Sequence, residues 1–220
     1  METNEYLIPT PAIESDHPQI AGKARELISG LSDPINKAQA IFYFVRDRIK
    51  YDMFVDFLTF EEYRASRTLE RGGGFCVMKA VLLAALGRAA GIPSRLGFAD
   101  IINHRAPEYV VKAMGTNLFT YHGFAEFFLN GRWVKATPAF DLPLCRKNRI
   151  TPVEFDGKND AMLPEYDLDG KIIHIEYVKN HGSFADLPYE TIVETFLKVY
   201  GHMDMASWQE AYKQHMGDGK

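Results

Sequence analysis

The chain has 220 residues, of which 46% are hydrophobic and 25% are charged, with a net charge of −4 and a pI near 6.0. This length fits one domain with a sizeable core, and the composition is that of an ordinary globular protein. The acidic excess argues against nucleic acid as the main partner, because no basic surplus can neutralise phosphates. No apolar run approaches the roughly 20 residues that a membrane span needs, so we expect no membrane partner.

The two cysteines, Cys76 and Cys145, are too few for a disulfide scaffold and form no CxxC pair of the kind that binds zinc. No two histidines show metal-ligand spacing on one element, so we expect neither a metal nor a cofactor. The N-terminus METNEYLIPTPAIESD lacks a basic segment followed by an apolar one. We therefore expect no signal peptide, and a cytoplasmic protein with reduced thiols.

Two helices are predicted at the start of the chain, over residues 18–29 and 34–50. Asp16 precedes the first and Asp33 the second, and each helix has a proline in its first turn. Apolar residues recur at helical spacing in the second, which predicts its buried face: Ile35, Ala38, Phe42, Val45 and Ile49.

The segment Gly72-Gly73-Gly74-Phe75-Cys76 leads directly into an apolar run over residues 77–90. Only Lys79 and Arg88 are charged in this run, which predicts a central helix that is buried on all sides. Cys76 would lie in its first turn. There the free N–H groups and the positive end of the helix dipole favour the thiolate, as a nucleophilic cysteine requires.

Strands are predicted over residues 95–103, 119–129 and 132–136, and a turn over 166–171 leads into a strand over 172–178. Helical patterns follow over 189–200 and 206–215, before a frayed tail over 217–220. The order of helices, then mostly antiparallel strands, then helices predicts a single α+β domain over residues 1–216.

Asn130-Gly131 predicts a two-residue hairpin turn of type I′. In that register, residues whose numbers sum to 261 lie opposite each other. Phe128 then faces Trp133, and Glu126 faces Lys135, two pairs that stabilise antiparallel strands.

The same hairpin register pairs Phe124 with Thr137 and His122 with Ala139. It places Thr137 and Asp141 on the face of His122, unless Pro138 ends the ladder first. A hydroxyl or a carboxylate is then placed to accept the second ring N–H of His122 and to fix its tautomer.

These segments resemble the transglutaminase-like superfamily, a papain-related group that includes proposed bacterial cysteine proteases. The resemblance is carried by GGGFCVMKAVLLAALGRAAGIPSR (72–95), YHGFAEFFLNGRWVKATPAFD (121–141) and IFYFVRDRIKYD (41–52), within a core of about 38–141. It implies a papain-like cysteine proteinase fold, in which a central buried helix carries Cys76 and packs on an antiparallel β-sheet. The aspartate of the family pattern aligns with Thr137.

The resemblance also implies a catalytic triad that transfers an acyl group from an amide or peptide bond through a thioester. Cys76 would be the nucleophile, its backbone N–H the first oxyanion donor, and His122 the base. We favour Asp141 as the third member, with Thr137 as the alternative. The second oxyanion donor is not identified.

We expect a peptide or protein substrate and hydrolysis, with an amine-accepting transglutaminase as one alternative. A non-catalytic module that binds peptides or proteins is another, because Thr137 replaces the family aspartate. A structural zinc protein is the third. A lone cysteine on an apolar helix is also often only a small buried side chain.

Overall fold

The computed structural model describes residues 3–201, 208, 210, 212 and 213. The helix predicted over residues 206–215 lies for the most part outside the described residues, and the predicted tail over 217–220 lies wholly outside them. The described helices are α1 (Pro18–Leu27), α2 (Pro34–Arg48), α3 (Ala65–Arg71), α4 (Cys76–Ala89), α5 (Glu108–Met114), α6 (Leu142–Asn148) and α7 (Tyr189–Tyr200), with 3-10 turns η1 (Asn4–Tyr6) and η2 (Phe60–Tyr63).

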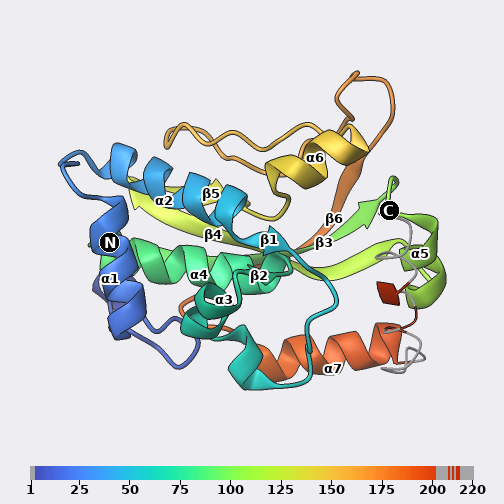
Figure 1. The fold of residues 1–220 in the computed structure, drawn as a ribbon, viewed down its shortest axis with the longest axis horizontal. Helices are drawn as coiled ribbons and strands as arrows, with labels where there is room; N and C mark the ends of the chain where they lie inside the picture. Colours follow the sequence, from blue (N-terminus) through green and yellow to red (C-terminus); the bar gives the residue numbers. More distant parts are fainter. Residues whose placement is uncertain (1–2, 202–207, 209, 211, 214–220) are drawn as a thin grey trace.

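The main sheet contains four antiparallel strands in the order β5-β4-β3-β6. Their bounds are β3 (Ser94–Asn103), β4 (Leu118–Leu129), β5 (Arg132–Ala136) and β6 (Ile175–Phe184). A separate parallel pair joins β1 (Lys50–Tyr51) to β2 (Gly73–Gly74) directly before α4. Figure 1 shows this pair between the ends of α2 and α4.

Helix α4 is the centre of the core. Every residue from Val77 to Arg88 is buried, as the unbroken apolar run predicts. The helix contacts β4 and β3 on one side and α1, α2 and α3 on the others (Figure 1). The predicted α+β class, with a cysteine-bearing central helix packed on an antiparallel sheet, is therefore confirmed.

The hairpin between β4 and β5 forms in the predicted register. Phe128 pairs with Trp133 and Glu126 with Lys135 around the Asn130-Gly131 turn, where both residues have positive φ. The ladder ends at Ala136, so the predicted pairs Phe124–Thr137 and His122–Ala139 are wrong.

The chain leaves the β4–β5 hairpin at Thr137. The backbone N–H of Thr137 donates to Ala161 instead of β4, at 2.9 Å, and Pro138 has no N–H to continue the ladder.

Helix starts were predicted with mixed success. Asp33 caps α2 as expected, accepting from the backbone N–H of Asn36 at 2.9 Å. The cap of α1 is His17 rather than Asp16. Helices α5 and α6 have only seven residues each and were not predicted, because two turns are too short to show an apolar period.

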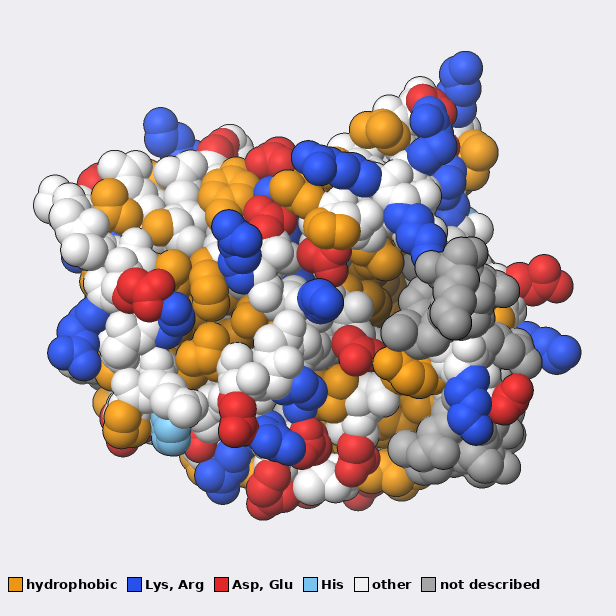
Figure 2. Space-filling model, viewed as in Figure 1, with side chains coloured by type: hydrophobic (Ala, Val, Ile, Leu, Met, Phe, Trp, Pro, Cys, Tyr) orange, Lys and Arg blue, Asp and Glu red, His pale blue; other side chains and the backbone are white. Residues whose placement is uncertain are grey.

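The predicted turn over residues 166–171 is present, with the Gly170 N–H donating to the Asp167 carbonyl at 2.9 Å. Its strand, β6, starts at Ile175 rather than at 172 and extends to Phe184. Figure 2 shows both signs of charge interspersed over the face in view, which fits the small net charge. Among the described residues, no helix is long and apolar enough to cross a bilayer.

Candidate active site

The glycine run before Cys76 has a defined structure. Gly72 has φ +67 and ends α3 in the left-handed conformation, which glycine adopts without strain. Gly73 and Gly74 then pair in parallel with Lys50 and Tyr51. The run therefore ends one helix, forms a short strand against β1 and starts α4 at Cys76.

The strand that carries His122 is irregular directly before it. Tyr121 has φ +51, which is rare for a residue with a Cβ, and β3 shifts register opposite it, around Asp100. The Asp100 carboxylate accepts from the Tyr121 N–H at 3.0 Å and pairs with Nε2 of His181 at 2.6 Å. The Tyr121 ring stacks on His181, with ring centroids 3.9 Å apart. These contacts hold the backbone that orients His122.

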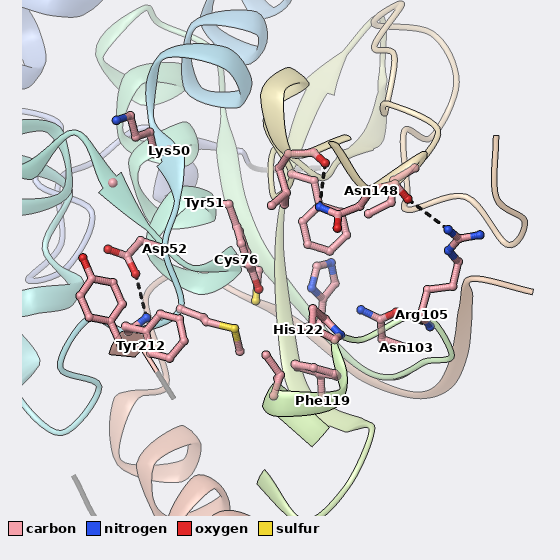
Figure 3. A pocket seen from close by; sticks show the side chains of 18 of the residues that line it. Lys50, Tyr51, Asp52, Cys76, Asn103, Arg105, Phe119, His122, Asn148 and Tyr212 are labelled. Carbon is pink, nitrogen blue, oxygen red and sulfur yellow. Dashed lines mark hydrogen bonds between the residues drawn. The ribbon is translucent and has the colours of Figure 1, made fainter. Parts of the chain in front are cut away.

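Cys76 and His122 line the same cleft, which has a volume of about 510 Å³ (Figure 3). The first turn of α4 packs directly on β4, because a Cβ on Gly123 would lie 2.8 Å from Cα of Val77. The backbone of Gly123 also hydrogen-bonds the Cys76 thiol. The structure thus brings together the two residues that the sequence identifies as nucleophile and base.

The electrostatics of this pair differ from the sequence-based prediction of a stabilised thiolate. Burial raises the pKa of the Cys76 thiol to about 11, although backbone hydrogen bonds from Gly123, Val77 and Cys76 itself act in the opposite direction. Burial lowers the pKa of His122 to about 3. Desolvation opposes both charged forms, so the resting pair is a neutral thiol and a neutral imidazole.

The structure records no hydrogen bond from His122 to Asp141 or Thr137. Nε2 of His122 is buried without a partner among the described residues. The two oxygens of Asp141 accept from the backbone N–H groups of Leu144 at 2.9 Å and Tyr51 at 2.8 Å. Asp141 is thus the N-cap of α6 and an anchor for β1, and its role as orienter of His122 stays a prediction.

Thr137 occupies the position of the family aspartate and is fully buried. Its hydroxyl donates to the sulfur of Met162 at 3.5 Å. The Tyr177 ring lies edge-on to His122, with centroids 6.3 Å apart. The Tyr177 hydroxyl accepts from the backbone N–H of Leu163 at 3.1 Å, which holds the ring in this position.

Tyr51 is a site residue that the sequence analysis missed. Its side chain lines the cleft together with Cys76, and Figure 3 shows it extending towards the sulfur. Burial is the main cause that raises the pKa of Tyr51 well above the ordinary tyrosine value, and the nearby Cys76 is the second. The phenol therefore keeps its proton. The only sequence signal was its place in the IKYD segment, in which a tyrosine has no distinctive chemistry.

Lys79, one turn after Cys76, is fully buried. Its ammonium donates to the carbonyls of Arg46 at 3.1 Å and Ile49 at 2.5 Å. Burial lowers its pKa to about 7. Because Ile49 ends α2 and precedes β1, Lys79 ties the strand that carries Tyr51 to the helix that carries Cys76.

Cys145 does not line this cleft. Cys145 is buried in α6, and this burial is the main cause that raises its pKa to about 11. Neither Cys76 nor Cys145 forms a disulfide. Among the described residues, no group of three or more His, Cys, Asp or Glu side chains is arranged to hold a metal ion. The cleft offers the Cys76 thiol and the His122 imidazole as reactive groups.

The family model of the transglutaminase-like superfamily matches residues 21–138, more than half of the chain. The chain belongs to the transglutaminase-like superfamily. The matched segment contains Cys76, His122 and Thr137, and it ends before Asp141.

Three solved structures are similar to this chain at low identity. A proposed cysteine protease from Cytophaga hutchinsonii is 17% identical, with a TM-score of 0.47, over 81% of this chain and 52% of that one. The periplasmic domain of TgpA from Pseudomonas aeruginosa is 17% identical, with a TM-score of 0.44, over 63% and 48%. A proposed protease from Parabacteroides distasonis is 16% identical, with a TM-score of 0.40, over 61% and 25%.

The chain thus spans between a quarter and about half of the length of these structures. It matches no curated protein.

Proposed function

We propose that the protein is a cysteine hydrolase that cleaves an amide or peptide bond through a thioester on Cys76. The observation that carries the proposal is the shared cleft. A cysteine at the start of a buried helix and a histidine on the adjoining strand line one space of about 510 Å³, and Gly123 holds the two elements in contact. A nucleophile and a base in one accessible cleft form the minimal unit of covalent acyl transfer.

The reaction starts from the neutral pair. The thiol proton of Cys76 moves to His122 as the sulfur attacks the carbonyl carbon of the substrate. Because burial keeps the resting imidazole neutral, one ring nitrogen has a free lone pair to accept this proton. The tetrahedral intermediate then collapses: the bond to the leaving amine breaks, and His122 returns the proton to that amine. Water, deprotonated by His122, then attacks the thioester carbonyl carbon. The bond between that carbon and the Cys76 sulfur breaks, the acid leaves, and His122 returns its proton to the sulfur.

The oxyanion of the tetrahedral intermediate needs donors aimed at the cleft. The backbone N–H of Cys76, at the free end of α4, is the first. The Tyr51 hydroxyl is our candidate for the second, since it stays protonated and lies beside Cys76. Losing one such donor typically costs a factor on the order of 10²–10³ in rate.

A non-catalytic module that binds peptides or proteins is the alternative, and one observation favours it. Nε2 of His122 has no carboxylate partner in the described part of the chain, and the His122 pKa of about 3 disfavours the imidazolium that catalysis requires. An amine as acyl acceptor, in place of water, would make the enzyme a transglutaminase. The peptide or protein substrate and the cytoplasmic location remain predictions.

The test is acylation of the purified chain by p-nitrophenyl acetate, followed by intact-mass and peptide mapping. We expect one acetyl group on Cys76, and release of p-nitrophenolate that Cys76→Ala and His122→Gln both abolish. Cys145→Ser is the matched control and should leave the reaction unchanged. Acylation that survives Cys76→Ala, or no acylation of the folded wild type, would support the binding module instead.

A further inference from the structure

A second, smaller pocket opens beside Cys76. It has a volume of about 70 Å³ and shares Tyr51, Met53, Cys76 and Phe119 with the large cleft. Its other walls come from segments far apart in the sequence and are mainly apolar, among them Phe57, Phe75, Met114 and Phe196. The nucleophile therefore lies between two spaces of different character.

The large cleft carries the polar side chains, including Lys50, Asp52, Asn103 and Arg105 (Figure 3). Polar groups of this kind can hydrogen-bond the amides of a peptide. The small pocket is lined by far fewer polar side chains, so the cleft and the pocket suit different parts of one substrate.

Two polar side chains of the small pocket are already bonded to each other. The Tyr200 hydroxyl accepts from the Thr120 backbone N–H at 2.7 Å and donates to the Leu118 carbonyl at 2.9 Å. The Thr120 hydroxyl donates to the Tyr200 hydroxyl oxygen at 3.2 Å. A polar ligand group placed here would lose its water and find these partners occupied, so this wall favours an apolar group.

Trp208 also lines the pocket, and its indole N–H is buried without a partner among the described residues. The residue is only 5% exposed. The indole ring adds a further large apolar face to the wall of the pocket.

We propose that the small pocket binds the apolar side chain of the acyl donor, while the polar cleft takes the leaving amine. The proposal rests on the proposed acyl transfer at Cys76 and names its substrate class. A cavity of about 150 Å³ holds a benzene molecule, so 70 Å³ fits a branched or straight chain of about three or four carbon atoms. The preferred donor has a small aliphatic side chain, neither a charged nor a large aromatic one.

The test compares p-nitrophenyl esters of acetate, butyrate, hexanoate and octanoate on the purified full-length chain, each corrected for its own hydrolysis by hydroxide. Burying one methylene raises the rate about fourfold. We therefore expect kcat/KM to rise by about tenfold or more from acetate to butyrate and to fall again at octanoate. Acyl-Cys76 is measured by intact mass in the same samples.

Met114→Ala should enlarge the pocket and move the optimum to hexanoate. Lys112→Ala, an exposed change on the same helix, is the matched control and should keep the wild-type order. Thermal melts report whether each variant is folded. If Met114→Ala does not fold, the order of the four esters on the wild-type chain still tests the proposal.

The outcomes separate the two proposals. An optimum at butyrate that Met114→Ala shifts supports the pocket. Acylation of Cys76 with no preference for chain length, or fastest with acetate, overturns the pocket and leaves acyl transfer standing. Failure of every ester to acylate Cys76 overturns acyl transfer, and the acyl pocket with it.

Discussion

Gly123 lies so close to Val77 that a Cβ on Gly123 would be 2.8 Å from Cα of Val77 and 3.2 Å from its nitrogen. Gly123 follows His122 in the chain, and Val77 follows Cys76. One backbone contact therefore sets the separation of the two predicted catalytic side chains. Only a residue without a side chain lets the strand and the helix approach this closely.

Gly123→Ala is expected to separate α4 from β4 at the site. Because the nearest atoms are backbone, they cannot yield as a flexible side chain would, and we expect a loss of about 1–3 kcal/mol in the free energy of unfolding. The rate of Cys76 acylation should fall more than tenfold. Urea denaturation and the ester assay measure the two effects.

Gly22→Ala is the control for this change, since a Cβ there meets nothing within 4 Å. In the middle of α1 it should stabilise the chain by up to about 1 kcal/mol. Equal effects of the two substitutions on acylation would show that the Gly123 contact does not set the site geometry.

The reactivity of Cys76 should report a buried thiol. With its pKa raised to about 11, the thiolate fraction is small at pH 7 and grows tenfold for each pH unit up to that value. Iodoacetamide labelling of folded protein should therefore accelerate steadily from pH 7 to 10. Cys145 has a similar pKa but is more deeply buried than Cys76, which is partly exposed in the cleft, so Cys145 should label more slowly throughout.

In urea both thiols are exposed to solvent. The labelling rate of each should then reach half of its maximum near pH 8.5, the ordinary pKa of cysteine. A plateau below pH 8 for folded Cys76 would instead support the stabilised thiolate that the sequence suggested.

Asp141→Ala should mainly destabilise the chain. It removes the cap of α6, worth about 1 kcal/mol, and leaves the Tyr51 N–H without its acceptor, at about 1–3 kcal/mol. Thr137→Val, which keeps the shape and removes the hydroxyl, is the matched test of the position of the family aspartate.

We expect Asp141→Ala to lower the melting temperature and Thr137→Val to change acylation by less than about threefold. A large loss of acylation in a stable Thr137→Val would assign the orienting role to that hydroxyl. The same loss in an Asp141→Asn variant with a normal melting temperature would restore the triad that the sequence analysis favoured.

The fold was predictable because local patterns specify it. The unbroken apolar run after Cys76 identifies the central helix, and Asn130-Gly131 fixes the register of the hairpin. The pairing of Cys76 with His122 came from the family resemblance instead, because spacing in the sequence cannot show that two residues so far apart in the chain meet.

The electrostatics of the site could not be predicted, because they depend on burial. The start of a helix lowers the pKa of a cysteine, but the burial of Cys76 outweighs it, and burial is a property of the whole fold. Asp141 was expected to extend the hairpin, but Pro138 and the bond from Thr137 to Ala161 end the ladder first. The positive φ of Tyr121 has no signal in the sequence, since it depends on Asp100 across the sheet.

Lys79→Met should change how stability depends on pH. The pKa of Lys79 is about 7 in the folded chain and 10.5 in its ordinary state, so the unfolded chain binds more protons between these values. Wild-type stability therefore rises with pH across this window and is lost as the pH falls towards 7. Lys79→Met removes this dependence.

The measurement is the difference in the free energy of unfolding between wild type and Lys79→Met at pH 7, 8.5 and 10. We expect the wild type to gain several kcal/mol relative to the variant across the series. For Lys112→Met, on the exposed face of α5, the difference should stay constant. A constant difference for Lys79→Met as well would mean that the buried ammonium keeps its ordinary pKa.

Tyr51→Phe should separate stabilisation of the oxyanion from reactivity of the thiol. Alkylation by iodoacetamide forms no oxyanion, so its rate at Cys76 should stay within about twofold of wild type. Acylation by p-nitrophenyl butyrate passes through an oxyanion and should lose a factor on the order of 10²–10³ in kcat, with little change in KM. Tyr109→Phe, a second tyrosine of the cleft, is the control. If alkylation and acylation fall together, Tyr51 positions Cys76 rather than the oxyanion, and if neither falls, the second donor is another group in the cleft.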